Sequence, residues 1–210
     1  MNSPCFISFD GPKATGKTTV LEAVGDALRA DGRFPVVELC EKDLDPDRAA
    51  TLHLIKQLTA NPTEELEYLV CEKLAAGRAW ITDHVLSQVD ATSVVLIDRW
   101  YPSDAAFRRI LPFTEIMAMN LSRGVRIPDL HVGVVTTPEV SWARAMARPR
   151  GLSSVVIQSL EEHAACSAAF NRAIVANDWF SCRNESSVEH AALLVQEAID
   201  GLPRRNALNQ

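Results

Sequence analysis

The chain of 210 residues has little cysteine, and its cysteines form no pattern. Five are present, an odd number, and none belongs to a C-x-x-C pair. A disulfide framework is therefore not expected, and reduced, buried thiols of a cytoplasmic protein fit this usage best. The five histidines lack the spacing of metal ligands, so we expect no zinc site.

Long hydrophobic runs and an excess of positive charge are missing as well. No stretch approaches the roughly 18 uninterrupted apolar residues of a membrane span, and the first residues carry no basic segment typical of a signal peptide. The formal net charge is −6. Because nucleic-acid polymers and membrane surfaces bind basic faces, we expect neither as a partner.

What the sequence has is an alternation of short apolar runs with longer helical patterns. The run VVLI and its neighbours are apolar without alternation, as in strands buried on both faces of a parallel sheet. This order predicts βαβ units, hence an α/β fold with a five-stranded parallel sheet flanked by helices. The length favours one domain over residues 1–202, followed by a tail over 203–210. The expected strands cover 5–9, 35–39, 93–97, 130–135 and 179–182, and the expected helices cover 17–30, 46–58, 64–88, 103–122, 138–147, 156–177 and 187–199.

Residues 11–18, GPKATGKT, fit the pattern G-x-x-x-x-G-K-[ST], and we call this segment the glycine loop. An expected strand precedes it and an expected helix follows, which is the context that the motif requires. Glycines let consecutive backbone N–H groups point inward, at the positive end of the helix dipole. Lys17 would then neutralise the β- and γ-phosphate oxygens, and the Thr18 hydroxyl would bind Mg²⁺. The loop therefore predicts a site for a nucleoside triphosphate and Mg²⁺.

A second candidate pair follows the strand expected over 93–97. Asp98 and Arg99 stand at its carboxyl end, the edge at which open α/β sheets bind ligands. Asp98 would hold Mg²⁺ or its waters, and Arg99 would bind a second anionic group.

Several segments resemble the thymidylate kinase family. DRWYPSDAAF (98–107) is similar to its DRY-x-x-S-x-x-A-[YF] segment, and IPDL (127–130) to its P-D-L strand entry. TTPEVSWARAMARPRG (136–151) resembles its P-E helix and arginine-rich lid. GRAW (77–80) resembles a helix segment in which an arginine contacts the acceptor phosphate, and FDGPKATGKTT (9–19) resembles its phosphate loop. The matches keep the family's order from residue 6 to about residue 151.

The resemblance implies a three-layer P-loop kinase fold that transfers the ATP γ-phosphate to a nucleoside monophosphate. It implies a lid over about 147–156 and a homodimer, for which the apolar helices around Val70 and Ala105 could supply the contact. The catalytic residues would be Lys17, Asp98, Arg99 and Arg148, with Thr18 and Asp98 at the Mg²⁺, partly through water. The donor would contact Gly11, Lys13, Ala14, Thr15, Gly16, Lys17, Thr18, Thr19, Arg144 and Arg150. The acceptor would contact Asp10, Glu41, Leu74, Arg78, Arg99, Ser103, Phe107 and Arg108.

Departures from the family pattern concern the acceptor. Leu74 stands where the family usually has a phenylalanine that stacks on thymine, and Arg108 where a glutamine often reads the base. Since an arginine offers only donors and carries charge, it favours a carbonyl-rich or anionic partner. We therefore expect a (deoxy)nucleoside monophosphate acceptor, with a non-thymine or modified base as the hypothesis. The alternative is an alignment displaced by one helical turn, with Trp80, Tyr68 or Trp100 stacking on the base.

Two other functions stay open. A deoxynucleoside kinase, or another small-molecule kinase of this fold, would use a carboxylate near the end of the second strand as base, and Glu38 and Glu41 are candidates. A nucleotide-dependent switch or an inactive nucleotide-binding protein would also carry the glycine loop. The sequence has no N-K-x-D motif for guanine, and it keeps Lys17, Thr18 and Asp98, which disfavours both of these.

Overall fold

Five parallel strands form one sheet in the order β2-β3-β1-β4-β5 in the computed structural model, which describes residues 3–149 and 157–203. The register pairs Ile7 of β1 with Leu96 of β3 on one side and with Leu130 of β4 on the other. Every strand end lies within one residue of its predicted position. The strands are β1 (Cys5–Asp10), β2 (Val36–Cys40), β3 (Val94–Asp98), β4 (Leu130–Val135) and β5 (Phe180–Arg183).

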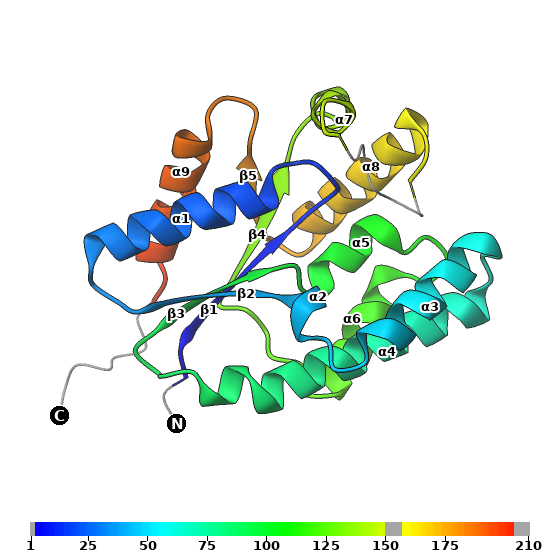
Figure 1. Cartoon of the computed structure of the whole chain (residues 1–210), viewed down its shortest axis with the longest axis horizontal. Coiled ribbons are helices and arrows are strands. Elements are labelled where there is room, and N and C mark those ends of the chain that lie inside the picture. The colour runs from blue at the N-terminus through cyan, green and yellow to red at the C-terminus, as the bar shows by residue number, and fades with distance from the viewer. Residues whose placement is uncertain (1–2, 150–156, 204–210) are drawn as a thin grey trace.

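Helices cover both faces of the sheet, as predicted (Figure 1). They are α1 (Lys17–Asp31), α2 (Glu41–Leu44), α3 (Arg48–Ala60), α4 (Glu64–His84), α5 (Asp104–Phe107), α6 (Phe113–Ser122), α7 (Pro138–Met146), α8 (Leu160–Ala176) and α9 (Val188–Asp200), with short 3₁₀ turns at Leu86–Gln88 and Tyr101–Ser103. Side-chain caps start several of them. Thr63 accepts a hydrogen bond from the N–H of Leu66, and Ser159 forms a reciprocal capping box with Glu162.

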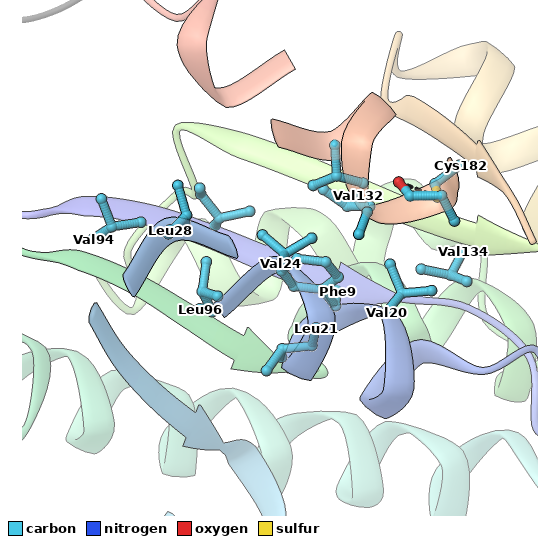
Figure 2. Close-up of a cluster of buried hydrophobic side chains, with 14 residues drawn as sticks. Phe9, Val20, Leu21, Val24, Leu28, Val94, Leu96, Val132, Val134 and Cys182 are labelled. Carbon is cyan, nitrogen blue, oxygen red and sulfur yellow. Dashed lines mark hydrogen bonds between the residues drawn. The ribbon is translucent and has the colours of Figure 1, made fainter. Parts of the chain in front are cut away.

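Alternate residues of β1 face two separate hydrophobic layers. Ile7 and Phe9 pack under α1 and α9 in the first layer, which Figure 2 shows together with Val20, Val24 and other buried side chains. Phe6 points to the opposite face, into the layer under α4 that also contains fully buried Trp100. This alternation is the period of two that strands impose, and it fixes the sheet between the two helical layers.

The helix predicted over 103–122 is wrong as one element, because α5 ends at Phe107 and α6 begins at Phe113. Pro112 has no N–H to donate, and the residue before a proline disfavours helical angles. In the intervening loop the buried carboxylate of Glu67 accepts hydrogen bonds from the backbone N–H groups of Arg109, Ile110 and Leu111. The loop is thus held by a side chain from α4 rather than by a helical ladder.

A smaller correction concerns a helix end. Val70 and Ala105 themselves are buried inside the chain, with 0% and 7% of their surface exposed, so a contact between subunits would use other residues of their helices. The helix predicted over 64–88 ends at His84. Residues 150–156 of the predicted lid and residues 204–210 of the predicted tail lie outside the described residues. No helix in the described parts of the chain is long and apolar enough to cross a membrane.

Candidate active site

The glycine loop joins β1 to α1 with a backbone that only glycine tolerates at two positions. Gly11 and Gly16 have φ angles of 142° and 91°. A Cβ on Gly11 would overlap the backbone oxygen of Val134, and one on Gly16 would overlap the side-chain amide of Asn184. No side chain caps the N-terminus of α1, so its first N–H groups stay available to an anion. The loop therefore has the shape and the polarity of a phosphate site.

Lys17 and Thr18 occupy the first turn of α1 and face the end of β3. The Lys17 ammonium donates to the backbone oxygen of Pro12 at 2.7 Å, and burial, together with the nearby Arg99, lowers the pKa of Lys17 well below its usual value. The Thr18 hydroxyl donates to Asp98 Oδ2 at 2.6 Å. The other oxygen, Asp98 Oδ1, is buried without a hydrogen-bond partner among the described residues.

These groups fit Mg²⁺, which prefers oxygen ligands. The Thr18 hydroxyl could bind the ion directly, and the unpartnered Asp98 oxygen could bind it or one of its waters. No cluster of three or more His, Cys, Asp and Glu side chains that could hold a metal ion occurs among the described residues. The protein alone thus offers few ligands, which fits a cation bound together with phosphates and waters.

Arg99 has a left-handed backbone, with φ at 73°, that is rare outside glycine. Its guanidinium lies 5.0 Å from the centre of the Phe107 ring, a cation–π contact. Its Nη1 is 3.5 Å from both the backbone oxygen of Gly11 and the Ser103 hydroxyl. A strained residue held by several contacts is typical of a functional position. Arg99 is therefore fixed next to the glycine loop.

A cavity of about 720 Å³ connects the glycine loop to α3, α4 and α5. Nine cationic and four acidic side chains line it, although the whole chain has a net charge of −6. The cavity is therefore a positively charged region of an acidic protein and suits an anionic ligand. Of the predicted site residues, Lys13, Ala14, Gly16, Lys17, Thr18, Thr19, Glu41, Leu74, Arg78, Asp98, Arg99, Ser103, Phe107, Arg108 and Arg148 line it.

Four predicted contact residues do not line this cavity, and Arg150 lies outside the described residues. Gly11 and Thr15 shape the glycine loop from within, where the Thr15 hydroxyl donates to the backbone oxygen of Pro12. Arg144 Nη1 donates to the backbone oxygen of Asn184 at 2.8 Å. The fourth residue, Asp10, is described next.

Asp10 lies beneath the site and braces it. Its Oδ1 accepts hydrogen bonds from the N–H groups of Trp100 and Ser103 and from the Ser103 hydroxyl, at 2.8, 3.1 and 2.6 Å. Burial raises the pKa of this carboxyl to about 6. Asp10 thus ties the end of β1 to the segment after β3. A role in touching the acceptor stays a prediction that these contacts do not support.

Arg78 is fully buried in an ionic cluster. Its Nε donates to Glu41 at 2.6 Å, and its Nη1 donates to Asp104 at 2.7 Å and to Asn120 at 3.2 Å. Burial alone would lower the pKa of the guanidinium, but the Asp104 and Glu41 carboxylates together raise it above its ordinary value. Two of its three nitrogens are therefore engaged within the protein, which leaves little of Arg78 for the predicted acceptor phosphate.

Only some of the aromatic side chains considered lie where a base bound in the cavity could stack on them. Phe107 lines the cavity, whereas Trp80, Tyr68 and Trp100 do not. Trp100 is buried edge-on against Phe6, and Trp80 is half-exposed and stacked on His84. The displaced alignment has no support from this geometry, and Leu74 lines the cavity. Contact of Leu74 with the acceptor stays a prediction.

Sequence reasoning missed three groups of residues at the site. Asp104 and Asn120 complete the Arg78 cluster, and no local pattern signals that. Asn184 Nδ2 donates to the backbone oxygen of Thr15 and so supports the glycine loop from the end of β5. The third group could have been found, because its members repeat at helical spacing on one face of α3. They are Arg48, Leu52, Ile55 and Lys56, all lining the cavity.

Comparison with known proteins finds relatives that are all thymidylate kinases. The thymidylate kinase of Leuconostoc citreum is 30% identical over 166 residues, covering 72% of each chain. That of Halalkalibacterium halodurans is 32% identical over 152 residues, covering 69% of this chain and 70% of the relative. A thymidylate kinase structure from Ehrlichia chaffeensis superposes with a TM-score of 0.64 at 15% identity, covering 94% of this chain and 99% of that one. No protein-family model matches the chain.

Proposed function

The chain belongs to the thymidylate kinase family and is a phosphotransferase, and from that premise we propose that it transfers the γ-phosphate of ATP to a nucleoside monophosphate. One observation carries the proposal. The Thr18–Asp98 pair and the glycine loop line a cation-rich cavity of about 720 Å³ that also reaches residues of α3, α4 and α5. The cavity can therefore hold a donor and an acceptor together.

The arrangement suits phosphoryl transfer because this reaction depends mainly on alignment and on positive charge around the moving phosphate. Lys17 and the backbone amides of the glycine loop would bind the donor phosphates. Mg²⁺, held by Thr18 and Asp98, would neutralise phosphate charge. Arg99, fixed between the loop and Phe107, would bind the acceptor phosphate. Arg148, at the start of the predicted lid, lines the cavity and would add charge on the donor side.

The acceptor we propose is a (deoxy)nucleoside monophosphate whose base is non-thymine or modified. Leu74 supports this because it presents an apolar wall where an aromatic face would stack on a base. Phe107 is an aromatic side chain that lines the cavity, but the Arg99 guanidinium already lies over its ring. The base would consequently be held more by hydrogen bonds than by stacking.

A nucleoside kinase of the same fold is the rival. It would need a free carboxylate as general base near the acceptor hydroxyl. Glu38 pairs with Arg29 at 2.5 Å, and Glu41 pairs with Arg78 at 2.6 Å. Because both candidate bases are held in ion pairs, the geometry favours the monophosphate as acceptor.

An ATP-consumption assay with a panel of nucleosides and nucleoside monophosphates tests the proposal. We expect turnover with at least one monophosphate and none with nucleosides. Lys17→Ala should lower turnover by about a thousandfold or more, because it removes charge from the developing transition state. Lys73→Ala is the matched control, since Lys73 pairs with Asp47 and neither side chain lines the cavity. Turnover of a nucleoside but not of its monophosphate would establish the rival.

We also propose that the protein is a cytoplasmic homodimer. Free cysteines at all five positions fit a reducing compartment. Tyr68, Leu69 and Trp80 of α4 are 47%, 39% and 39% exposed and could supply an apolar contact between subunits. Light scattering coupled to size-exclusion chromatography checks the mass. A monomer at micromolar concentration would exclude the dimer.

A further inference from the structure

A second cavity, of about 620 Å³, lies between α8 and the segment that joins α5 to α6. α5 packs against α8 (Figure 1). None of the described residues that line this second cavity belongs to the glycine loop, α1 or α3, so it is separate from the place where ATP would bind in the first cavity. Its volume falls within the range of small-molecule sites, roughly 300–1,000 Å³.

Positive charge dominates the charged side chains of the second cavity. Three arginines line it, Arg108, Arg109 and Arg172, against one carboxylate, that of Asp104. This carboxylate is already engaged, because Asp104 Oδ2 accepts a hydrogen bond from Arg78 at 2.7 Å. The second cavity therefore has an excess of positive charge in a chain whose net charge is −6, and it suits an anionic ligand.

Arg108 is the most deeply buried of the three arginines. Only 7% of its side chain is exposed, and its Nε is buried without a hydrogen-bond partner among the described residues. Its ion pair with Asp104 measures 3.7 Å, which is too long for a hydrogen bond. Because burial of a cationic donor without an acceptor is unfavourable, a ligand that supplies an anionic oxygen is favoured here.

The other two arginines come from the two sides of the second cavity. Arg109, in the segment before α6, donates from Nη2 to Cys166 Sγ at 3.0 Å and to the backbone oxygen of Glu162 at 3.4 Å. Sulfur is only a weak acceptor. Arg172 is exposed on α8, and its side chain makes no hydrogen bond or ion pair with a described residue. Both guanidinium groups can therefore still donate to an anion in this cavity.

Most of the remaining lining is apolar. Leu111, Pro112 and Phe113 line the side formed by the segment between α5 and α6 and the start of α6. α8 contributes small side chains at helical spacing, which leave a flat face on which a planar ring can lie. They are Ala165, Ala169, Ala173 and Ala176. A ligand with an anionic group and a planar apolar body therefore matches both parts of the lining.

We propose that the second cavity is an effector site for a phosphate ester with a planar aromatic body. A phosphate is favoured over a carboxylate because its three terminal oxygens can accept hydrogen bonds from all three arginines. Arg108 lines both cavities and so connects the effector to the acceptor side of the first cavity. A phosphate that accepts from Arg108 Nε draws the guanidinium away from Asp104 and lowers the affinity for the acceptor, a consequence that rests on the proposed function.

Binding of phenyl phosphate to the unaltered protein, measured by calorimetry, tests the site. We expect phenyl phosphate to bind at least about tenfold more tightly than inorganic phosphate, which lacks the ring, and than benzyl alcohol, which lacks the charge. Benzoate should also bind more weakly than phenyl phosphate, and tighter binding of benzoate would overturn the choice of a phosphate. Absence of phenyl phosphate binding at millimolar concentrations would overturn the site.

Four variants identify the cavity that is occupied. Arg172→Gln removes a charge from the second cavity and Ala169→Leu fills its flat face, so each should weaken phenyl phosphate binding at least about tenfold. Arg48→Gln and Ala168→Leu are the matched controls, because Arg48 lines only the first cavity and Ala168 lines neither. Thermal unfolding verifies that each variant is folded. Loss of binding in Arg48→Gln but not in Arg172→Gln would place the probe in the first cavity and contradict the proposal.

Kinetics test the effector role. Where a monophosphate is phosphorylated, saturating phenyl phosphate should raise its KM about tenfold, and Arg172→Gln should remove this effect. A KM that does not change while the second cavity is occupied would overturn the effector role. Failure of the proposed function would look different, because calorimetry on the same four variants still shows whether the second cavity binds the phosphate ester when no monophosphate is phosphorylated.

Discussion

Gly16 combines a left-handed backbone with a neighbour that leaves no room for a side chain. Gly16→Ala should lower stability by about 1–2 kcal/mol and weaken ATP binding about tenfold or more, because the Cβ would push the Asn184 amide away from the glycine loop. Gly32→Ala is the control, since Gly32 has a φ of 69° but nothing within 4 Å of an added Cβ. That variant should lose stability and keep ATP affinity. Equal ATP affinity in both variants, measured by calorimetry, would refute this role.

His131 makes stability depend on pH. It lies between the Ser8 hydroxyl at 3.2 Å and the Tyr101 hydroxyl at 3.1 Å, and burial lowers its pKa from 6.5 to about 4. The unfolded chain therefore binds a proton between pH 6.5 and pH 4 that the folded chain does not, so stability is lost as the pH falls through this range.

Comparison of histidine variants isolates this effect. His131 should contribute about 2 kcal/mol to the loss of stability between pH 8 and pH 5, and His131→Gln should remove that part. His53→Gln, at an exposed position of α3, should leave the pH profile unchanged. Urea unfolding at the two pH values measures both. A His131→Gln profile parallel to that of the unaltered protein would disprove the mechanism.

Some residues of the candidate site could be predicted from the sequence alone, and others could not. The positions of Lys17, Thr18 and Asp98 were predictable because Asp98 ends a strand and Lys17 and Thr18 open a helix. Their roles stay predictions. The partners of Arg78 come from positions 41, 104 and 120, which only the folded chain brings together. Asp104 was missed for this reason, and the resemblance assigned Arg78 to the acceptor phosphate without these internal partners.

Glu67 decides the path of the segment between α5 and α6. One of its oxygens accepts N–H groups from Ile110 at 2.8 Å and Leu111 at 2.7 Å, and both accept from Arg109. Glu67→Gln should lower the free energy of unfolding by about 2 kcal/mol. The neutral amide oxygen accepts hydrogen bonds more weakly than the carboxylate does, and the new NH₂ group is buried without an acceptor. Since Phe107 and Arg108 precede this segment, KM for the acceptor should rise more than kcat falls.

Glu65→Gln is the matched control on the same helix, because Glu65 is exposed. Urea unfolding and amide hydrogen exchange of residues 109–111 measure the effect. Exchange at these amides that is no faster in Glu67→Gln than in the control would show that the carboxylate does not hold the segment.

Elements were predicted best where their pattern is regular. The strands were correct to within one residue, because buried apolar runs bounded by polar turns leave few alternatives. The prediction of one helix over 103–122 was wrong because apolar residues also occur in the segment between α5 and α6, so the pattern does not show the interruption. The Glu67 carboxylate that accepts the hydrogen bonds of the break lies on a helix some forty residues earlier in the chain. A tertiary contact of this kind has no local signature.

Strand order determines where the site forms. The order β2-β3-β1-β4-β5 sets the carboxyl ends of β1 and β3 side by side, so the glycine loop and Asp98 meet at one edge of the sheet. The alternation of strands and helices predicted a parallel sheet but not this order. The cationic side chains come together in an acidic chain because α1, α3, α4 and α5 all contribute residues to the cavity at this edge of the sheet.

Transfer of labelled phosphate tests the proposed reaction most directly. ATP labelled in its γ-phosphate, Mg²⁺ and each nucleoside monophosphate of the panel would be incubated with the protein, and the labelled products would be separated. We predict that the label moves to the nucleoside diphosphate, and that Lys17→Ala abolishes this transfer while Lys73→Ala does not. Label that appears only as inorganic phosphate, or on a nucleoside supplied in place of its monophosphate, would contradict the proposal that this protein phosphorylates nucleoside monophosphates.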